Sequence, residues 1–382
     1  MAKATKKNNG AAEGSARGSD PEAPLNDMQV VDLPESFRQE FTADTYRAGQ
    51  YTHDELGLST DDLLAMYRNM LLQRRFEERA AQMYGKQKIA GFLHLYIGQE
   101  AVSTGAAWSM NVGRDSVITA YRDHGIALAL GMDTNACMAE LFGKIDGCSR
   151  GKGGSMHFFD AEKKMFGGHG IVGGHIPVGT GLAFSHKYKE EGAANICFFG
   201  DGAVGQGSFH EAINLAGLYD LPIIFVIENN QYAMGTAVHR AFSETDFYKQ
   251  AQGYDIEAVV VNGMDVLTVY KAFADHMPRA RKGQPFLFEI RTYRYRGHSM
   301  SDPAKYRTKE ELEQKKNEDP IIRLKSYMVK AELATNEDFD AIDDEVKEEV
   351  LQSVEFAEQS PLPPLETIYD DVYTQKDYPF LS

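Results

Sequence analysis

The sequence predicts an α/β protein whose core is a doubly wound, mostly parallel β-sheet. Short apolar runs alternate along the chain with stretches of helical periodicity, and several connections between them are rich in glycine. This alternation is typical of parallel strands, because a helix must return the chain to the start of the sheet before the next strand. The predicted strands span residues 116–120, 196–199, 222–227, 257–261 and 286–291.

Composition indicates a soluble enzyme. The 382 residues are 43% hydrophobic and 25% charged, which is ordinary for a globular protein that buries one large α/β core or two smaller ones. A net charge of −16 argues against nucleic-acid binding, which requires a basic face. The three cysteines lack the spacing of a metal site or a redox motif, and no apolar run approaches the length of a transmembrane helix. We therefore expect neither nucleic acid nor a membrane as a partner.

The chain divides into an N-terminal extension, residues 1–58, and an α/β domain, residues 59–382, whose C-terminal region is charged and helical. The extension lacks sustained periodicity and is rich in small, acidic and proline residues, which predicts disorder. It has no apolar signal core, and its acidic residues are unusual for a transit peptide, so we expect a cytoplasmic protein. Ser59 and Asp62 have capping-box spacing, and the charged residues at 74–79 are expected on the solvated face of the following helix.

The stretch from Asn195 to Tyr232 organises the predicted site. Its two apolar runs flank a helical pattern, which predicts a βαβ unit with parallel strands. The turn Gly200–Gly202 follows the first strand, and Asn229–Asn230 ends the second. Ligands of such sheets bind beyond the carboxyl ends of the strands, so these two segments should meet in space.

Two chemistries compete for this stretch. Gly200, Gly202 and Gly205 satisfy GxGxxG, and Glu228 ends the next strand, as in a dinucleotide-binding dehydrogenase. Against this stands Asp201, whose charge would repel a bare diphosphate by about 4 kcal/mol at ~4 Å and an effective dielectric constant of ~20. A divalent cation turns that repulsion into attraction, and Asp201, Asn230 and a nearby main-chain carbonyl are ligands that Mg²⁺ accepts. The metal-plus-diphosphate interpretation is therefore favoured.

GDG, then 26 residues, then NN is similar to the thiamine-diphosphate binding motif. The segments GDGAVGQGSFHEA and ENNQYAMGT further resemble the α subunits of pyruvate dehydrogenase E1 components, in the thiamine-diphosphate-dependent 2-oxo acid dehydrogenase family. The resemblance extends from about Ser59 to about Tyr369 and implies the thiamine-diphosphate-binding fold. It implies thiamine diphosphate and Mg²⁺ as cofactors, with Asp201, Asn230 and the main-chain oxygen of Tyr232 as metal ligands.

The same resemblance implies further cofactor contacts. Arg122, at the carboxyl end of a predicted strand, could pair with phosphate or make a surface ion pair, and the resemblance favours phosphate. By family position, the cofactor-binding residues are Tyr121, Arg122, Gly170, Val172, Asp201, Gly202, Ala203, Asn230, Tyr232 and His298. Gly170 and Val172 would act through their backbone. The roles of Lys152, His157, His169 and His175 stay open.

Two histidines are the candidate catalytic residues. The segment HLYIGQEA resembles the family segment whose histidine faces the 2-oxo acid. The resemblance therefore implies that a protonated His94 could bind the substrate carboxylate or stabilise the charge that develops in the reaction. The segment RGHSMSDP resembles the active-site loop of the family, which implies that His298 lies near the reacting centre. Its sequence is closer to that of pyruvate-type enzymes than to that of branched-chain enzymes. Ser299 matches a serine that is phosphorylated in animal relatives, from which no regulation of this chain follows.

The resemblance implies oxidative decarboxylation of pyruvate and transfer of the acetyl unit to the lipoyl group of an E2 acyltransferase. The glutamate that activates thiamine comes from a separate β chain in two-subunit relatives, so we expect an α₂β₂ heterotetramer and an inactive lone α chain. The alternatives are an acetoin or branched-chain 2-oxo acid dehydrogenase α subunit and, from another class, a Rossmann NAD-binding dehydrogenase.

Overall fold

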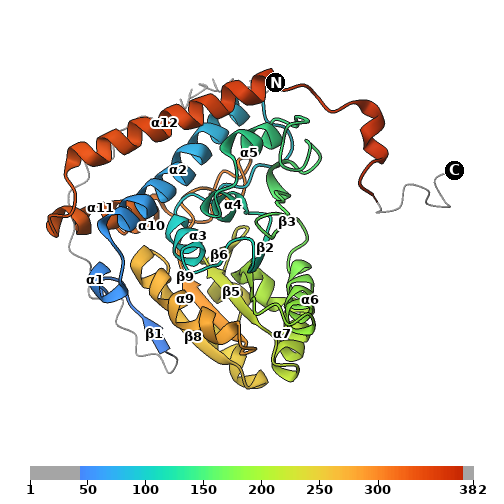
Figure 1. The fold of residues 1–382 in the computed structure, drawn as a ribbon, viewed down its shortest axis with the longest axis vertical. Helices are drawn as coiled ribbons and strands as arrows, with labels where there is room; N and C mark the ends of the chain where they lie inside the picture. The colour runs from blue at the N-terminus through green and yellow to red at the C-terminus, as the bar shows by residue number, and fades with distance from the viewer. Residues whose placement is uncertain (1–43, 373–382) are drawn as a thin grey trace, which may run out of the picture.

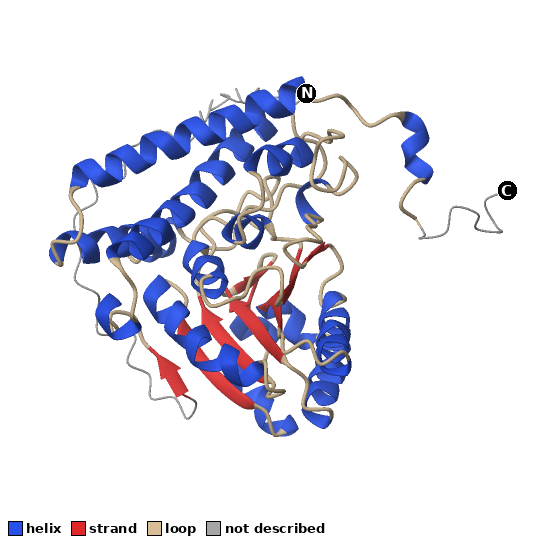
Figure 2. Cartoon of the chain, in the orientation of Figure 1, coloured by secondary structure: helices blue, strands red, loops and turns tan. Residues whose placement is uncertain are grey.

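The computed structural model describes residues 44–372, and its centre is a seven-stranded parallel sheet in the order β1-β8-β9-β5-β4-β2-β3. Figure 2 shows this sheet between helices. All five predicted strands are confirmed. The strands are β1 (Asp44–Tyr46), β2 (Ser116–Ala120), β3 (Met165–His169), β4 (Asn195–Gly200), β5 (Ile223–Asn229), β8 (Glu257–Asn262) and β9 (Phe286–Arg291). The sequence MFGGH of β3 did not indicate a strand, because two glycines replace the expected apolar residues.

Helices cover both faces of the sheet, so alternate residues of one strand enter different cores. In β4, Ile196 and Phe198 belong to the larger core, which includes residues of α2 (Thr60–Gly85), α3 (Glu100–Ala107), α9 (Val266–Ala280), α11 (Pro320–Lys330) and α12 (Asn336–Gln359). Cys197 and Phe199 pack in the second core with α6 (His175–Tyr188) and α7 (Gly207–Leu218). This is the predicted doubly wound α/β architecture (Figure 1).

The remaining elements are short. They are α1 (His53–Leu56), α4 (His124–Ala129), α5 (Thr134–Leu141), α8 (Val238–Ala241), α10 (Lys309–Lys316), β6 (Tyr232–Ala233), β7 (Thr236–Ala237), η3 (Gly154–Met156), η4 (Asp201–Gly205), η5 (Phe247–Tyr254) and η6 (Leu365–Tyr369). In Figure 1 α12 crosses the molecule beside α2 and α5, and the chain then leaves the body towards η6. None of the helices within residues 44–372 has the length and apolarity needed to cross a membrane.

Ordered structure begins before Ser59. β1 pairs with β8 through Asp44 and Val259, and α1 follows it, so residues 44–58 of the predicted extension are folded; residues 1–43 lie outside the described residues. The predicted capping box is confirmed: the Asp62 carboxylate accepts from the Ser59 N–H at 2.8 Å, and the Ser59 hydroxyl accepts from the Asp62 N–H at 3.2 Å. Helix α2 therefore starts where the sequence predicted.

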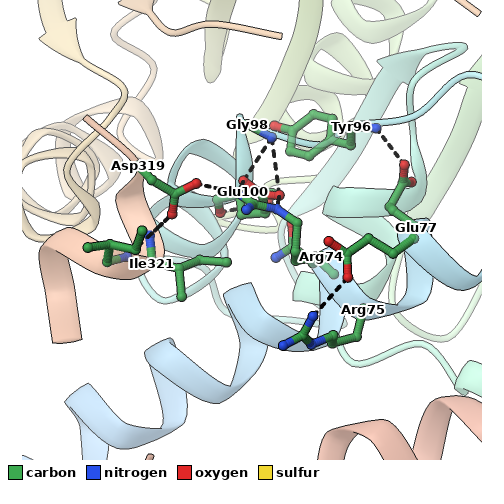
Figure 3. Close-up of polar contacts among 12 residues, drawn as sticks. Arg74, Arg75, Glu77, Tyr96, Gly98, Glu100, Asp319 and Ile321 are labelled. Atoms are coloured by element: carbon green, nitrogen blue, oxygen red, sulfur yellow. Dashed lines mark hydrogen bonds and ion pairs between the residues drawn. The ribbon is translucent and has the colours of Figure 1, made fainter. Parts of the chain in front are cut away.

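The charged residues at 74–79 do not form a solvated face, and that prediction was wrong. Arg74 is buried and donates to Glu100 at 2.6 Å and to Asp319 at 2.9 Å (Figure 3). Glu77 is also buried, and it accepts from the Tyr96 N–H at 2.7 Å. The reason is that α2 is enclosed by α3, α11 and α12, so its polar side faces other helices.

The sheet topology positions the site. The chain after β2 leads to β3 on one side, whereas the chain after β4 leads to β5 on the other. The crevice between the carboxyl ends of β2 and β4 is the point where the winding reverses, and such points bind ligands in open α/β sheets. Tyr121 follows β2 and Asp201 follows β4, so the predicted residues begin at this crevice.

Candidate active site

The three predicted metal ligands converge. Asn230 Nδ2 donates to Gln99 Oε1 at 3.0 Å. This leaves Asn230 Oδ1 facing Asp201 Oδ1 at 3.3 Å and the main-chain oxygen of Tyr232 at 3.2 Å. Three oxygen acceptors therefore meet at one point, which is unfavourable unless a cation lies between them. In the alternative orientation of the amide, Asn230 Nδ2 would donate to both oxygens, which suits the same cluster without a cation.

The chemistry of this cluster fits Mg²⁺. Asp201 is buried, its Oδ2 has no hydrogen-bond partner, and burial raises its pKa to about 6. A carboxylate, an amide oxygen and a main-chain carbonyl are hard ligands, and a set this small leaves room for phosphate oxygens. Among residues 44–372 no group of three or more His, Cys, Asp and Glu side chains could hold a metal ion. This mixed oxygen cluster is therefore the candidate metal site.

The second glycine of the GDG turn allows two segments to approach closely. A Cβ at Gly202 would lie 2.6 Å from the Cβ of Ala233, in the hairpin formed by β6 and β7. That hairpin carries the Tyr232 carbonyl, and Ala203 beside it is buried. Gly202 thus permits the turn that carries Asp201 to pack against the hairpin that carries Tyr232.

Arg122 bridges two loops. Its buried guanidinium donates from Nη1 to the main-chain oxygen of Leu95 at 2.6 Å and from Nη2 to that of His298 at 2.8 Å. These carbonyls belong to the two segments that carry the candidate catalytic histidines. Phosphate binding by Arg122 stays a prediction, and the contacts here make it the residue that holds both histidine segments.

The rings of His94, Tyr121 and His298 form a triangle. The centroid distances are 4.7 Å from His94 to Tyr121, 5.1 Å from His94 to His298 and 5.5 Å from Tyr121 to His298. The Nδ1 atoms of both histidines are buried without a hydrogen-bond partner. The structure brings these three predicted site residues together, and the Nδ1 atoms of the two histidines are available to a ligand.

The surroundings of both histidines disfavour the protonated imidazole. Burial, followed by the charge of Arg122, lowers the pKa of His94 to about 3 and that of His298 to about 4. The lowered pKa of His94 therefore disfavours the protonated form that the resemblance implied. The main physical reason is burial, which disfavours a charged imidazole, and the positive charge of Arg122 adds to it.

Gly170 and Val172 lie beside the same edge. His169, the last residue of β3, pairs in register with Ala120, so Gly170 follows β3 as Tyr121 follows β2. Val172 is exposed, with 44% of its surface accessible. The register thus places Gly170 at the same edge of the sheet as Tyr121, and a thiamine contact of Gly170 and Val172 remains a prediction.

Of the residues whose roles were left open, Lys152 lies away from the cluster and donates to Asp371 at 2.8 Å. His157 Nδ1 contacts the Gly168 carbonyl at 2.9 Å. His169 and His175 stack at 5.8 Å, and His175 also contacts the Phe198 carbonyl at 2.8 Å. These contacts orient the chain around 168–175 and assign no reaction step.

Sequence reasoning missed several buried residues around the site. Gln99 holds Asn230, and Tyr96 donates to Glu228 through a short hydrogen bond. Burial raises the pKa of Glu228 to about 7. Gln99 and Tyr96 both lie in the HLYIGQEA segment, whose resemblance to the family could have drawn attention to them. Nothing in the sequence, however, indicates which strand end their side chains face.

Comparison with known proteins identifies the family of this chain. Residues 68–366 match the family model described as "Dehydrogenase E1 component". The chain is 50% identical to a Zymomonas mobilis protein over 319 residues, covering 83% of this chain and 90% of the relative. It is 47% identical to a Rickettsia prowazekii protein over 316 residues, covering 82% and 96%, and 46% identical to one from Porphyra purpurea over 318 residues, covering 81% and 92%. Each relative is named "Pyruvate dehydrogenase E1 component subunit alpha". The chain therefore belongs to the dehydrogenase E1 component family.

Proposed function

We propose that this chain is the α subunit of a pyruvate dehydrogenase E1 component, which oxidatively decarboxylates pyruvate and passes the acetyl unit to the lipoyl group of an E2 acyltransferase. The observation that carries the proposal is the convergence of the Asp201 carboxylate, the Asn230 amide and the Tyr232 carbonyl at the point where the sheet winding reverses, with Asp201 Oδ2 buried and without a hydrogen-bond partner. The names of the relatives support pyruvate as the substrate.

The residues of this chain would hold one half of the site. Asp201, Asn230 and the Tyr232 carbonyl would bind Mg²⁺ and, through it, the diphosphate of thiamine diphosphate. When bound, thiamine diphosphate supplies the nucleophilic carbon and the electron sink that decarboxylation of a 2-oxo acid requires. The backbone at Gly170 and Val172 would line the rest of the cofactor.

His94 and His298 would act as neutral imidazoles at the reacting centre. Each has a buried Nδ1 without a partner in the described chain, so each can accept or donate one hydrogen bond according to its tautomer. Neither ring needs to lose a proton before it can act as a base. Arg122 supplies the nearby positive charge that an anionic 2-oxo acid requires, and it holds both histidine segments.

A second subunit would complete the site. The relatives are named as α subunits, and helices α6 and α7 carry several exposed apolar side chains. The exposed apolar residues of this surface are Val178, Phe184, Tyr188, Leu215, Leu218 and Tyr219. Apolar surface of this kind is typical of subunit interfaces. We propose an α₂β₂ assembly in the cytoplasm whose β subunit covers this surface, so that the α chain alone is inactive.

The decisive experiment titrates thiamine diphosphate with Mg²⁺ against the α₂β₂ protein, in wild-type form and with Asp201→Ala. Substitution of outer-shell residues costs about 10- to 100-fold in metal affinity, so loss of a direct ligand should weaken cofactor binding by roughly 100-fold or more. Asp344→Ala on the exposed side of α12 is the control and should leave affinity unchanged. Unchanged affinity in Asp201→Ala would overturn the metal assignment.

Substrate competition on the assembled enzyme separates the remaining alternatives. Pyruvate should outcompete acetoin and branched-chain 2-oxo acids. Preference for either competitor would instead indicate the α subunit of an acetoin or branched-chain 2-oxo acid dehydrogenase. The NAD-binding alternative is disfavoured by Glu228, because its carboxyl group is buried against Tyr96. Thermal stabilisation by NAD, and none by thiamine diphosphate with Mg²⁺, would restore that alternative.

A further inference from the structure

We infer that His124 is a positioning residue that fixes the main chain at His94 through Ser155, and that Glu77 holds the ring of His124 in place. The inference rests on the proposed function, because it takes His94 as a group at the reacting centre. It deepens that function by naming the buried side chains that set the position of His94.

The ring of His124 is buried, and both of its nitrogens face oxygen atoms. Nδ1 lies 2.6 Å from Glu77 Oε1, and Nε2 lies 2.9 Å from the main-chain oxygen of Ser155. An ionised carboxylate and a carbonyl only accept hydrogen bonds, so both nitrogens carry a proton and the ring is an imidazolium. Burial disfavours this charge, but the adjacent Glu77 outweighs burial and raises the pKa of His124. His124 and Glu77 therefore form a buried ion pair that fixes the orientation of the ring.

Ser155 carries the contact from His124 to His94. Its hydroxyl oxygen lies 3.1 Å from His124 Nε2 and accepts from the His94 N–H at 3.1 Å. Ser155 is itself buried, in η3. The main-chain N–H of His94 is thus tied to the ion pair through one hydroxyl group. A displacement of His124 would move the main chain from which the His94 ring projects.

Glu77 also holds the chain on the other side of His94. Its second carboxylate oxygen, Oε2, accepts from the Tyr96 N–H at 2.7 Å (Figure 3). The two oxygens of one carboxylate on α2 therefore act on both sides of His94, directly at Tyr96 and through His124 and Ser155 at residue 94 itself.

These side chains are too enclosed to meet a substrate. The exposed fraction is 1% for Glu77, 0% for His124 and 5% for Ser155, whereas His94 Nδ1 has no hydrogen-bond partner. The three residues can therefore affect the reaction only through the position of His94. A displacement of about 1 Å can cost roughly 100-fold in rate.

The test measures kcat and KM for pyruvate, cofactor Kd and thermal unfolding of the α₂β₂ protein. Ser155→Ala removes the acceptor of the His94 N–H and keeps the main-chain oxygen that faces His124. The matched control is Ser353→Ala on α12, which removes a buried hydroxyl that donates to the Val350 main-chain oxygen at 2.7 Å. The midpoint of thermal unfolding should shift by a similar amount in the two variants, since each loses one buried hydroxyl group.

The kinetic effect should be confined to the positioning residues. Ser155→Ala should lower kcat/KM for pyruvate by roughly 10- to 100-fold and change cofactor Kd by less than about 3-fold, whereas Ser353→Ala should change neither. His124→Asn keeps an amide near Nδ1 and loses the contact with Ser155, so it should lose a similar factor. His124→Gln places its amide near Nε2 and should retain more activity than His124→Asn.

A double variant shows whether Ser155 acts through His94. In the background of His94→Ala, Ser155→Ala should change kcat/KM by less than about 2-fold. A full additional loss in that background, or wild-type kcat/KM in Ser155→Ala alone, rules the inference out. If His124→Asn fails to assemble, the Ser155 variants carry the test. A wild-type assembly that neither binds the cofactor nor decarboxylates pyruvate would instead refute the proposed function.

Discussion

Two buried polar clusters of this protein differ in whether their atoms are paired. In the cluster of Arg74, Glu100 and Asp319, each carboxylate oxygen accepts at least one hydrogen bond, and Glu100 also accepts from the Gly98 N–H (Figure 3). In the cluster of Asp201 and Asn230, the buried oxygen Asp201 Oδ2 has no hydrogen-bond partner. Both clusters are buried, so burial alone does not distinguish them.

The difference separates stability from function. A buried charge that is fully paired holds helices together, here α2, α3 and α11. Loss of one partner leaves the remaining charges buried without a counter-charge. A buried acceptor without a donor costs stability and persists where a ligand supplies the missing charge. The Arg74 cluster belongs to the first kind and the Asp201 cluster to the second.

The largest expected effect is on the paired cluster. Arg74→Met should lower the free energy of unfolding by about 3–5 kcal/mol, because Glu100 and Asp319 would stay buried without their cation. Denaturant unfolding measures this loss. Arg68→Met on the same helix is the control: its partner Glu349 is partly exposed, so the loss should be about 0–1 kcal/mol. Equal losses for the two variants would contradict the comparison.

The unpaired cluster should respond in the opposite direction. In the cofactor-free protein at pH 7, Asp201→Asn should raise the free energy of unfolding by about 1–2 kcal/mol, because it removes a buried charge. The variant should at the same time lose the stabilisation that thiamine diphosphate and Mg²⁺ give to wild type. Asp246→Asn is the control, since it removes a partly exposed charge paired with Arg291 and should cost about 0–1 kcal/mol. A lower free energy of unfolding in Asp201→Asn would show that the Asp201 carboxylate stabilises the fold, as the paired carboxylates do.

The smallest effect is on pH dependence. The pKa of Asp201 in the folded protein is about 6, above that of an unfolded aspartate, so the folded state binds the proton more tightly. Its contribution to stability therefore grows as pH falls through 6, by about 1 kcal/mol between ~pH 7 and ~pH 5 in the cofactor-free protein. The difference between wild type and Asp201→Asn in thermal unfolding at the two pH values isolates this contribution. A difference that does not change with pH would show that Asp201 titrates normally.

The sequence predicted the parts of the fold whose signals are local. The apolar runs of β2, β4, β5, β8 and β9 were found because each is continuous in the chain. The Asp201–Asn230 pair was found because strand ends of a parallel sheet share one edge. Long-range pairing was not predictable. Arg74 has the pattern of a solvated helix face until Asp319 from α11 is brought against it, and β3 lacks an apolar run.

Charge states were equally beyond the sequence. A protonated His94 was expected from the resemblance, whereas burial and the charge of Arg122, which lies after another strand, lower the pKa of its ring. The hydrogen bond from Arg294 Nη1 to the main-chain oxygen of Tyr232 joins two segments whose contact only the folded chain reveals. In each case the missing information was the identity of neighbours distant in the chain.

The edge strand β1 has a practical consequence. It pairs with β8 through Asp44, Thr45 and Tyr46, and thereby covers one margin of the sheet. An engineered chain that began after Tyr46 would leave the N–H and C=O groups of β8 open along the apolar sequence Ala258–Val261. Open edges of this kind recruit strands from other molecules. Shortening the protein past β1 should therefore promote aggregation while leaving every candidate site residue in the chain.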